Sequence, residues 1–254
     1  MRILVTNDDG IEAPGLKTLE EIARSLSDEV WIVAPETNHS GAGHSLSLRD
    51  PIRMREVDER RYAVQGTPTD CVIMAARRVM FDNLPELILS GVNMGQNLAE
   101  DVTYSGTIAA AFEGTLVGIR SIALSQSVGF REGKAPDWEI SKTHGPQLIR
   151  KLLEVDWPNG VLMNVNFPDC APDDVQGVRI TNQGRRDQSM LAIDERYDSW
   201  GRPYYWLGFG RKLSNPPEDV DLWAIYNGYI SVTPLSMNLT ARSMFSPLQA
   251  VVGD

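Results

Sequence analysis

Short apolar runs alternate along the chain with segments in which apolar residues recur at helical spacing. The runs are typical of strands buried on both faces of a sheet, and they lie at residues 2–6, 30–34, 87–90, 121–125 and 161–165. The helical segments lie between them, at residues 14–26, 67–76, 107–117 and 138–155. Alternating strands and helices predict an α/β protein with a mostly parallel sheet and helices on both faces.

The pattern changes after residue 168. Residues 178–181 and 229–233 are predicted as strands, and between them lies a stretch rich in Tyr, Trp and Arg. We interpret residues 185–210, and 187–206 in particular, as a protruding hairpin or arm; an irregular surface loop is the alternative. The organisation we expect is a metal- and phosphate-binding core at residues 1–168, followed by an extension at 169–254 that contains the arm, a closing strand and a tail.

A shorter hairpin is predicted earlier in the chain. Residues 52–57 and 61–65 have strand character and are separated by Asp58-Glu59-Arg60. The next helix begins at Thr67, because a threonine cap, Pro68 in the first turn and an acidic residue three positions on form a helix-start signal.

Composition is that of an ordinary globular protein, but the charge is acidic. The chain has 254 residues, 42% of them hydrophobic and 23% charged, with 34 acidic and 24 basic side chains and a net charge of −10. Such a balance repels nucleic-acid polymers and anionic membrane surfaces. A small phosphate ligand remains compatible with it, because a bound cation reverses the local field.

The small number of cysteines and the lack of a recognisable targeting signal lead us to expect a cytoplasmic protein. Cys71 and Cys170 are too few for a disulfide scaffold and are expected to be free thiols. No secretory leader is recognisable, and no apolar run approaches the roughly 18 residues that a membrane helix requires.

Polar residues follow three of the predicted strands. The first strand leads into Asp8 and Asp9, the second into a loop with Asn38 and Ser40, and the third into a segment with Asn93. Each alone is common in turns and caps. Because ligands bind outside the carboxyl ends of strands in open parallel sheets, the three junctions together predict one crevice of oxygen donors suited to Mg²⁺ or Mn²⁺. Zinc is less favoured, since no Cys or His has ligand spacing.

A fourth feature is the start of the helix at 107–117. Tyr104-Ser105-Gly106-Thr107 places small residues where backbone N–H groups and the helix dipole favour a phosphate. An ordinary helix cap is the alternative. The chain has no P-loop, no G-x-G-x-x-G after its first strand and no G-x-S-x-G elbow, so the corresponding NTPase, dinucleotide and hydrolase classes are disfavoured.

These residues make the chain resemble the SurE family of survival-protein nucleotidases over essentially its whole length. The matching segments, in order, are residues 1–10, 34–41, 66–71, 90–97, 104–107, 113–114 and 229–235. The resemblance implies a Rossmann-like fold with an extended C-terminal portion. It also implies a homodimer or homotetramer that exchanges C-terminal elements.

The resemblance further implies a metal-dependent phosphatase acting on nucleoside 5′-monophosphates, with 3′-monophosphates and short polyphosphate as further substrates. By motif position, one divalent cation is held by Asp8, Asp9, Ser40 and Asn93, and the phosphate lies at Asn97, Ser105, Gly106 and Thr107.

Two mechanisms and two functional classes stay open at this stage. Asp9 is the candidate general base for attack by a metal-activated water, and formation of an aspartyl-phosphate is the competing mechanism. A module that binds nucleotide or phosphate without turnover is the alternative to an enzyme.

Overall fold

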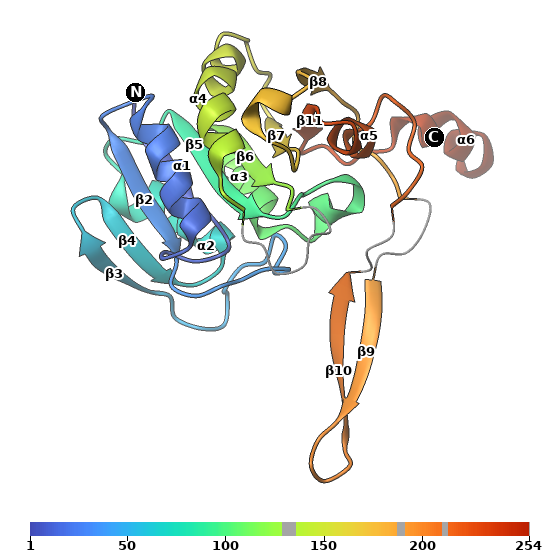
Figure 1. The fold of residues 1–254 in the computed structure, drawn as a ribbon, viewed down its shortest axis with the longest axis horizontal. Helices are drawn as coiled ribbons and strands as arrows, with labels where there is room; N and C mark the ends of the chain where they lie inside the picture. Colours follow the sequence, from blue (N-terminus) through green and yellow to red (C-terminus); the bar gives the residue numbers. More distant parts are fainter. Residues whose placement is uncertain (129–135, 187–190, 210–212, 254) are drawn as a thin grey trace.

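A nine-stranded sheet forms the centre of the computed structural model, which describes residues 1–128, 136–186, 191–209 and 213–253. Its order is β3-β4-β2-β1-β5-β6-β7-β11-β8 (Figure 1). The strands are β1 (Ile3–Thr6), β2 (Val30–Pro35), β3 (Arg53–Asp58), β4 (Arg61–Gln65), β5 (Leu87–Met94), β6 (Arg120–Gln126), β7 (Val161–Phe167), β8 (Val178–Ile180) and β11 (Ile230–Ser236). Neighbours are parallel except for β3 with β4 and β7 with β11. The predicted α/β, Rossmann-like fold class is confirmed.

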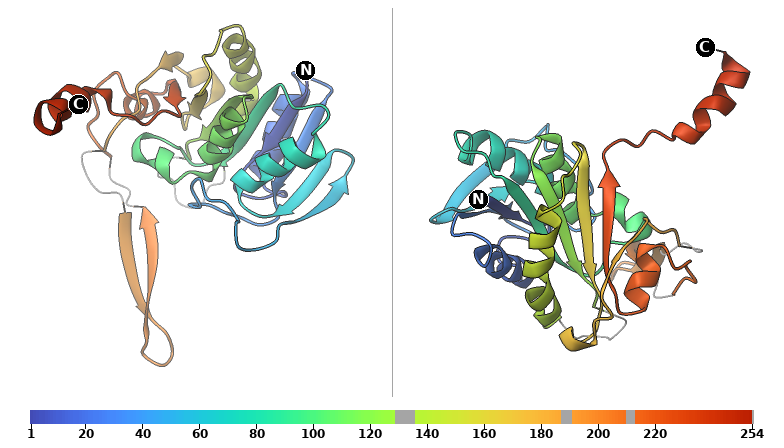
Figure 2. Two further views of the ribbon diagram at one scale, coloured as in Figure 1. Left: turned by 180° about the vertical axis from the view of Figure 1, so that it is seen from behind. Right: turned by 90° about the horizontal axis from the view of Figure 1, so that it is seen from above.

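Helices cover both faces of the sheet (Figures 1 and 2). They are α1 (Pro14–Arg24), α2 (Pro68–Met74), α3 (Gly106–Leu116), α4 (Glu139–Leu153), α5 (Asp221–Tyr226) and α6 (Phe245–Val252), with a π-helical turn at Ala75–Val79 and 3₁₀ turns at Ala99–Thr103, Pro172–Asp174 and Arg242–Met244. One apolar cluster joins α1 and α4 to the sheet through residues such as Leu16 and Ile149. A second joins α2 and α3 to the opposite face through Val72 and Ala110.

Local sequence signals explain several element boundaries. Pro14 stands in the first turn of α1, where its missing N–H costs nothing. Thr67 and Asp70 form the predicted capping box of α2, since each side chain accepts a hydrogen bond from the other's backbone N–H. The third buried strand, β5, continues past the predicted Ser90 to Met94, so Asn93 lies within the strand and pairs with Ser125 of β6.

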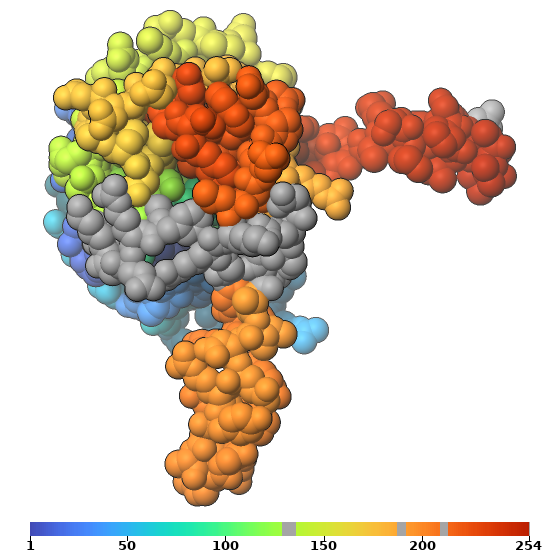
Figure 3. Space-filling model, turned by 45° about the vertical axis from the view of Figure 1, so that its right-hand side comes forward, coloured from blue at the N-terminus to red at the C-terminus, as the bar shows by residue number. Residues whose placement is uncertain are grey.

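The C-terminal segment contributes both to the sheet and to a projecting arm. β8 and β11 add to the sheet beside β7. The strands β9 (Leu191–Tyr197) and β10 (Pro203–Phe209) form a separate antiparallel hairpin, as predicted, which extends away from the body of the molecule (Figures 1 and 3). Residues 187–190 and 210 of the predicted arm lie outside the described residues.

The end of the chain differs from the sequence prediction. Helices α5 and α6 were not predicted, and α6 lies apart from the sheet with its apolar residues exposed (Figure 2). In the described ranges, no helix is both long and apolar enough to cross a membrane.

Candidate active site

The segment after β1 forms a tight turn that places Asp8 and Asp9 at the carboxyl edge of the sheet. Asn7 closes this turn, because its side-chain amide donates to the Gly10 carbonyl at 3.0 Å and its amide oxygen accepts from the Gly10 N–H at 3.3 Å. Gly10 has a φ of 109°, and a Cβ there would lie 3.3 Å from the carbonyl carbon of Thr37, so the turn requires glycine. Asp8 is left 4% exposed.

The first turn of α3 lies directly against Asp8. The Thr107 hydroxyl donates to Asp8 Oδ1 at 2.6 Å. At Gly106, a Cβ would lie 2.6 Å from the Cβ of Asp8, so only glycine allows this approach. Ser105 caps the helix, since its hydroxyl accepts from the Ile108 N–H at 3.1 Å. The positive end of the helix therefore lies beside the acidic turn.

The two carboxyl groups are in an environment that disfavours their charge. Burial raises the pKa of Asp8 to about 6; the Thr107 hydrogen bond opposes this rise and the neighbouring Asp9 adds to it. Burial also raises the pKa of Asp9, against hydrogen bonds from the Met94 backbone and the Asn38 side chain. Within the described residues neither carboxylate has a Lys or Arg ion pair. A bound cation would compensate both charges.

The loop after β2 brings Ser40 to this turn. The His39 N–H donates to the Asp8 carbonyl at 2.8 Å. Asn38 connects the two segments: its amide nitrogen donates to Asp9 Oδ1 at 3.4 Å, and its amide oxygen accepts from the Ser40 N–H at 2.7 Å. Ser40 is exposed and therefore accessible to a ligand.

Asn93 reaches the same edge from β5. Its amide nitrogen donates to the Gly95 carbonyl at 2.8 Å. This hydrogen bond uses the nitrogen, which is unable to ligate a cation, and leaves the amide oxygen as the possible ligand. The next residue, Met94, hydrogen-bonds Asp9 through its backbone.

Asn97 has a different environment. It is buried and donates to Ser125 Oγ at 2.8 Å, and no hydrogen bond in the described residues joins it to Asp8 or Asp9. The structure thus brings the acidic turn, the Ser40 loop, Asn93 and the start of α3 together, while the Asn97 side chain is used within the chain.

The donor chemistry at this edge fits a hard divalent cation. Two carboxylates, a hydroxyl and an amide oxygen are the ligand types that Mg²⁺ and Mn²⁺ prefer. In the part of the chain that the structure describes, no three His, Cys, Asp or Glu side chains form a group able to hold a metal. The raised pKa values of two adjacent carboxyl groups are the observation that favours a cation here.

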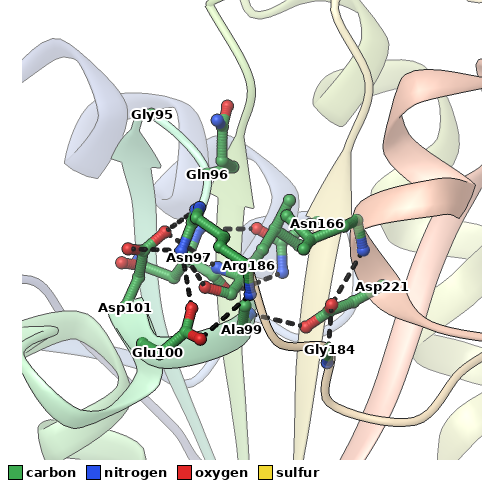
Figure 4. A network of polar contacts seen from close by, with 12 residues as sticks. Gly95, Gln96, Asn97, Ala99, Glu100, Asp101, Asn166, Gly184, Arg186 and Asp221 are labelled. Atoms are coloured by element: carbon green, nitrogen blue, oxygen red, sulfur yellow. Dashed lines mark hydrogen bonds and ion pairs between the residues drawn. The ribbon is translucent and has the colours of Figure 1, made fainter. Parts of the chain in front are cut away.

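A polar network holds the segment between β5 and α3 in place (Figure 4). Arg186, 7% exposed, contacts Asp101 at 2.7 and 3.0 Å and Glu100 at 3.3 Å. Asp221 accepts hydrogen bonds from the N–H groups of Ala99 and Gly184, each at 2.9 Å. The segment that ends at Ser105 is therefore fastened to residues far along the chain.

Two asparagines of β7 complete the network. Asn164 donates to the Asn97 carbonyl at 2.8 Å, and Asn166 accepts from the Asn97 N–H at 2.8 Å. Sequence reasoning missed these residues, Arg186 and Asp221. The signal was present for the asparagines, because both interrupt an apolar strand at positions that are 0% exposed and so require partners.

The chain is similar to known proteins over most of its length. The sequence model of a family described as "Survival protein SurE" matches residues 3–190. A protein named 5′-nucleotidase SurE from Methylorubrum extorquens (strain PA1) is 59% identical over 240 residues, which cover 94% of each chain. Another of that name, from Parvibaculum lavamentivorans, is 54% identical over 253 residues, covering 100% of this chain and 91% of that protein.

The fold is likewise similar to a solved structure. The crystal structure of the SurE protein from Aquifex aeolicus matches with a TM-score of 0.85 and 37% sequence identity, covering 98% of this chain and 99% of that one.

Proposed function

The chain belongs to the SurE family of survival proteins, and from that premise we propose that it is a 5′-nucleotidase, which hydrolyses nucleoside 5′-monophosphates to nucleoside and phosphate. Its relatives from Methylorubrum and Parvibaculum carry the name 5′-nucleotidase. The observation in this structure that carries the proposal is the contact between the Asp8 carboxylate and the first turn of α3. That contact supports the proposal because a carboxylate is a common cation ligand and the start of a helix is a favourable position for a phosphate.

The proposal includes one divalent cation, Mg²⁺ or Mn²⁺, held by Asp8, Asp9, Ser40 and Asn93. When bound, such an ion neutralises phosphate charge and acidifies a water molecule. The Thr107 hydroxyl keeps Asp8 in one orientation through its 2.6 Å hydrogen bond. Asn38 does the same for Asp9, while joining it to the Ser40 backbone.

The helix start supplies the phosphate contacts in this proposal. The first turn of α3, which contains Gly106 and Thr107, lies against Asp8, and the positive end of the helix would offset charge that develops on the phosphate oxygens there. The Ser105 hydroxyl and the Asn97 amide complete the proposed phosphate site. The Ser105 hydroxyl accepts from the Ile108 N–H and so keeps its own O–H as a donor, and the Asn97 amide nitrogen uses one of its two N–H groups on Ser125.

Asp9 is the proposed general base. It is less buried than Asp8, so its carboxylate is the more accessible of the two to a water molecule at this edge. In this role Asp9 takes the proton from the attacking water. Attack by an aspartate to give an aspartyl-phosphate is distinguished by the stereochemical course at a phosphorus made chiral with oxygen isotopes: direct water attack gives inversion, and net retention contradicts it.

Nucleoside 3′-monophosphates and short polyphosphate belong to the proposed substrate range. All present a terminal phosphoryl group, and the acidic turn and helix start recognise that group.

We also propose that the protein forms a homodimer or homotetramer through its C-terminal elements. On the arm, Tyr197 is 63% exposed, Trp200 80% and Trp206 59%. On α6, Phe245 and Val251 are 49% and 86% exposed. Exposed aromatic and aliphatic side chains on two projecting elements are typical of surfaces that another chain covers.

The experiment that tests the function is phosphate release from a panel of nucleoside 5′- and 3′-monophosphates and polyphosphate. Each reaction is run with EDTA and again after Mg²⁺, Mn²⁺ or Zn²⁺ is restored. We expect release from 5′-monophosphates that EDTA abolishes and Mg²⁺ or Mn²⁺ restores. No release with any metal, from protein whose circular dichroism shows it to be folded, favours a binding module without turnover.

A further inference from the structure

A cavity of about 390 Å³ lies at the same edge of the sheet as the candidate active site. It is lined by Gln96, Ser127, Pro168, Asp169, Cys170, Leu213, Ile225, Tyr226 and Gly228. Its volume falls in the range of small-molecule sites, roughly 300–1,000 Å³.

The position of the cavity follows from the sheet order. Gln96 comes after β5, Ser127 after β6, and Pro168 after β7, so the cavity lies over the carboxyl ends of three adjacent strands. The acidic turn follows β1, which is the neighbour of β5 on the other side. Strands are about 4.8 Å apart, so the near end of the cavity, after β5, is about 5 Å from the strand that leads into the acidic turn, and the part after β7 is about 14 Å away.

The cavity and the candidate active site share one continuous segment. Gln96 lies between Asn93, a proposed cation ligand, and Asn97, and its side chain points away from the polar network that surrounds Asn97 (Figure 4). The Gly95 N–H donates to the Gln126 carbonyl at 2.8 Å, which fixes this segment against the end of β6.

The lining suits a nucleoside better than a phosphate. Leu213, Ile225 and Tyr226 offer apolar and aromatic surface for the faces of a base. Gln96 and Ser127 offer polar groups, and their side chains are already oriented by a hydrogen bond of 2.7 Å from the Ser127 hydroxyl to Gln96 Oε1. The carboxylate of Asp169 is a hydrogen-bond acceptor, which suits ribose hydroxyls and disfavours an anion.

We propose that this cavity holds the base and ribose of the substrate, with the phosphate directed toward Asp8 and the start of α3. The proposal rests on the proposed nucleotidase function and adds a direction to it: the substrate lies along the carboxyl edge of the sheet, from β1 toward β7. Substrate discrimination then depends on residues after β5, β6 and β7.

Cys170 provides a direct test of occupancy that is independent of turnover. It lines the cavity and is partly exposed, whereas Cys71 is 0% exposed and serves as the internal reference. Burial and nearby carboxylates raise the pKa of Cys170, so alkylation with N-ethylmaleimide is followed at mildly alkaline pH by mass spectrometry. The probes are adenosine, adenosine 5′-monophosphate and inorganic phosphate, with and without Mn²⁺.

We expect adenosine and adenosine 5′-monophosphate to slow labelling of Cys170 at least fivefold at saturation, and inorganic phosphate to have no such effect. Equal labelling rates with and without adenosine and its monophosphate overturn the proposal. Protection by inorganic phosphate alone overturns it as well, because the cavity would then be an anion site.

A second measurement uses a variant that fills the cavity. Cys170→Trp should lower, by about tenfold or more, the ratio of kcat/KM for adenosine 5′-monophosphate to kcat/KM for glycerol 2-phosphate, which lacks a base. The matched control is Leu153→Trp in a cavity of about 530 Å³ at the opposite edge, lined also by Met1 and Glu86. An unaltered ratio for Cys170→Trp contradicts the proposal. If the wild-type protein hydrolyses neither ester, the nucleotidase function fails while the alkylation result still decides the nucleoside site.

Discussion

At the scale of single residues, the chemistry depends on how two adjacent carboxylates are held at the end of β1. Asp8 is buried, and its Oδ1 accepts from the Thr107 hydroxyl. Burial raises the pKa values of both Asp8 and Asp9, so the turn is electrostatically unfavourable by itself. A bound cation would compensate the charges of both carboxylates, and carboxyl groups with raised pKa values are frequent at functional sites.

The Thr107 hydroxyl gives the first prediction. Thr107→Val keeps the shape of a fully buried side chain but removes the donor to Asp8. An unsatisfied buried acceptor costs about 1–3 kcal/mol, which corresponds to a loss of about fivefold to 150-fold in kcat/KM if the bound substrate and the transition state are both affected. We expect this loss with adenosine 5′-monophosphate, mainly as a higher KM, with metal content retained.

The control for this variant is Thr107→Ser, which preserves the hydroxyl and removes only a methyl group. It should keep most of the wild-type kcat/KM. Equal kinetics for the Val variant and the wild type would assign Thr107 to helix packing alone.

At the scale of elements, the segment from β5 to α3 is positioned by distant parts of the chain. Arg186 contacts two carboxylates of the 3₁₀ turn at Ala99–Thr103, and Asp221 accepts a backbone hydrogen bond from that turn. The Ser105 N–H in turn donates to the Asp101 carbonyl, which connects this network to the cap of α3. The network therefore decides where the helix start lies relative to Asp8.

Arg186→Gln tests this positioning role. Removing the buried Arg186 guanidinium breaks ion pairs to two carboxylates that are partly exposed to water. Because solvent screens those carboxylates, we expect a loss of about 2–3 kcal/mol of stability. Because the 3₁₀ turn then loses its fixed orientation, we expect KM for nucleotide to rise about tenfold, by more than kcat falls. Arg186→Lys should recover part of the loss, since lysine keeps the charge but lacks the two-pronged guanidinium.

The comparison variant is Arg61→Gln, which removes another partly buried ion pair, to Glu20 at 2.9 Å, on a different part of the molecule. It should lower the melting temperature and leave KM close to the wild-type value. If KM also stays at the wild-type value in Arg186→Gln, Arg186 contributes to stability alone and has no positioning role.

Element-level features were predictable where one local rule decided them. The capping box at Thr67 and the apolar runs of the parallel strands depend on neighbouring residues, and both are confirmed. The polar residues after the strands reached the same edge because parallel strands end together. Arg186 and Asp221 were missed because the residues of the 3₁₀ turn that they contact are distant in sequence: Asp101 is 85 residues from Arg186, and Ala99 is 122 residues from Asp221. The short helix α5 was missed because its place is set by packing against β11 and the turn at Ala99 rather than by its own pattern.

At the scale of the whole molecule, two projecting elements leave apolar surface uncovered. The arm β9–β10 and helix α6 both extend from the body (Figures 2 and 3). Their exposed side chains include Trp200, Leu207 and Val251 at 80%, 76% and 86%. A monomer rarely keeps so much apolar surface in contact with water, which supports assembly through these elements.

Shortening the arm tests this assembly. Leu191 and Phe209 are paired across the hairpin, so residues 192–208 can be replaced by a two-residue Asn-Gly turn that joins strands already side by side. We expect the mass from light scattering to fall by a factor of two or more, with circular dichroism unaltered, because the arm forms its own two-stranded sheet. A shortened protein with the wild-type mass would refute the interface role of the arm.

The measurement that tests the whole account most directly is phosphate release from adenosine 5′-monophosphate by Asp8→Asn, with bound metal measured on the same sample. Asparagine preserves the shape of Asp8 while removing the charge that the acidic turn offers to a cation. Asp28→Asn, at an exposed position before β2, is the charge-matched control. We predict a loss of at least a hundredfold in kcat/KM together with weaker metal binding for Asp8→Asn, and neither effect for Asp28→Asn. Wild-type turnover and metal affinity in a folded Asp8→Asn protein would remove the acidic turn from the site and contradict the account.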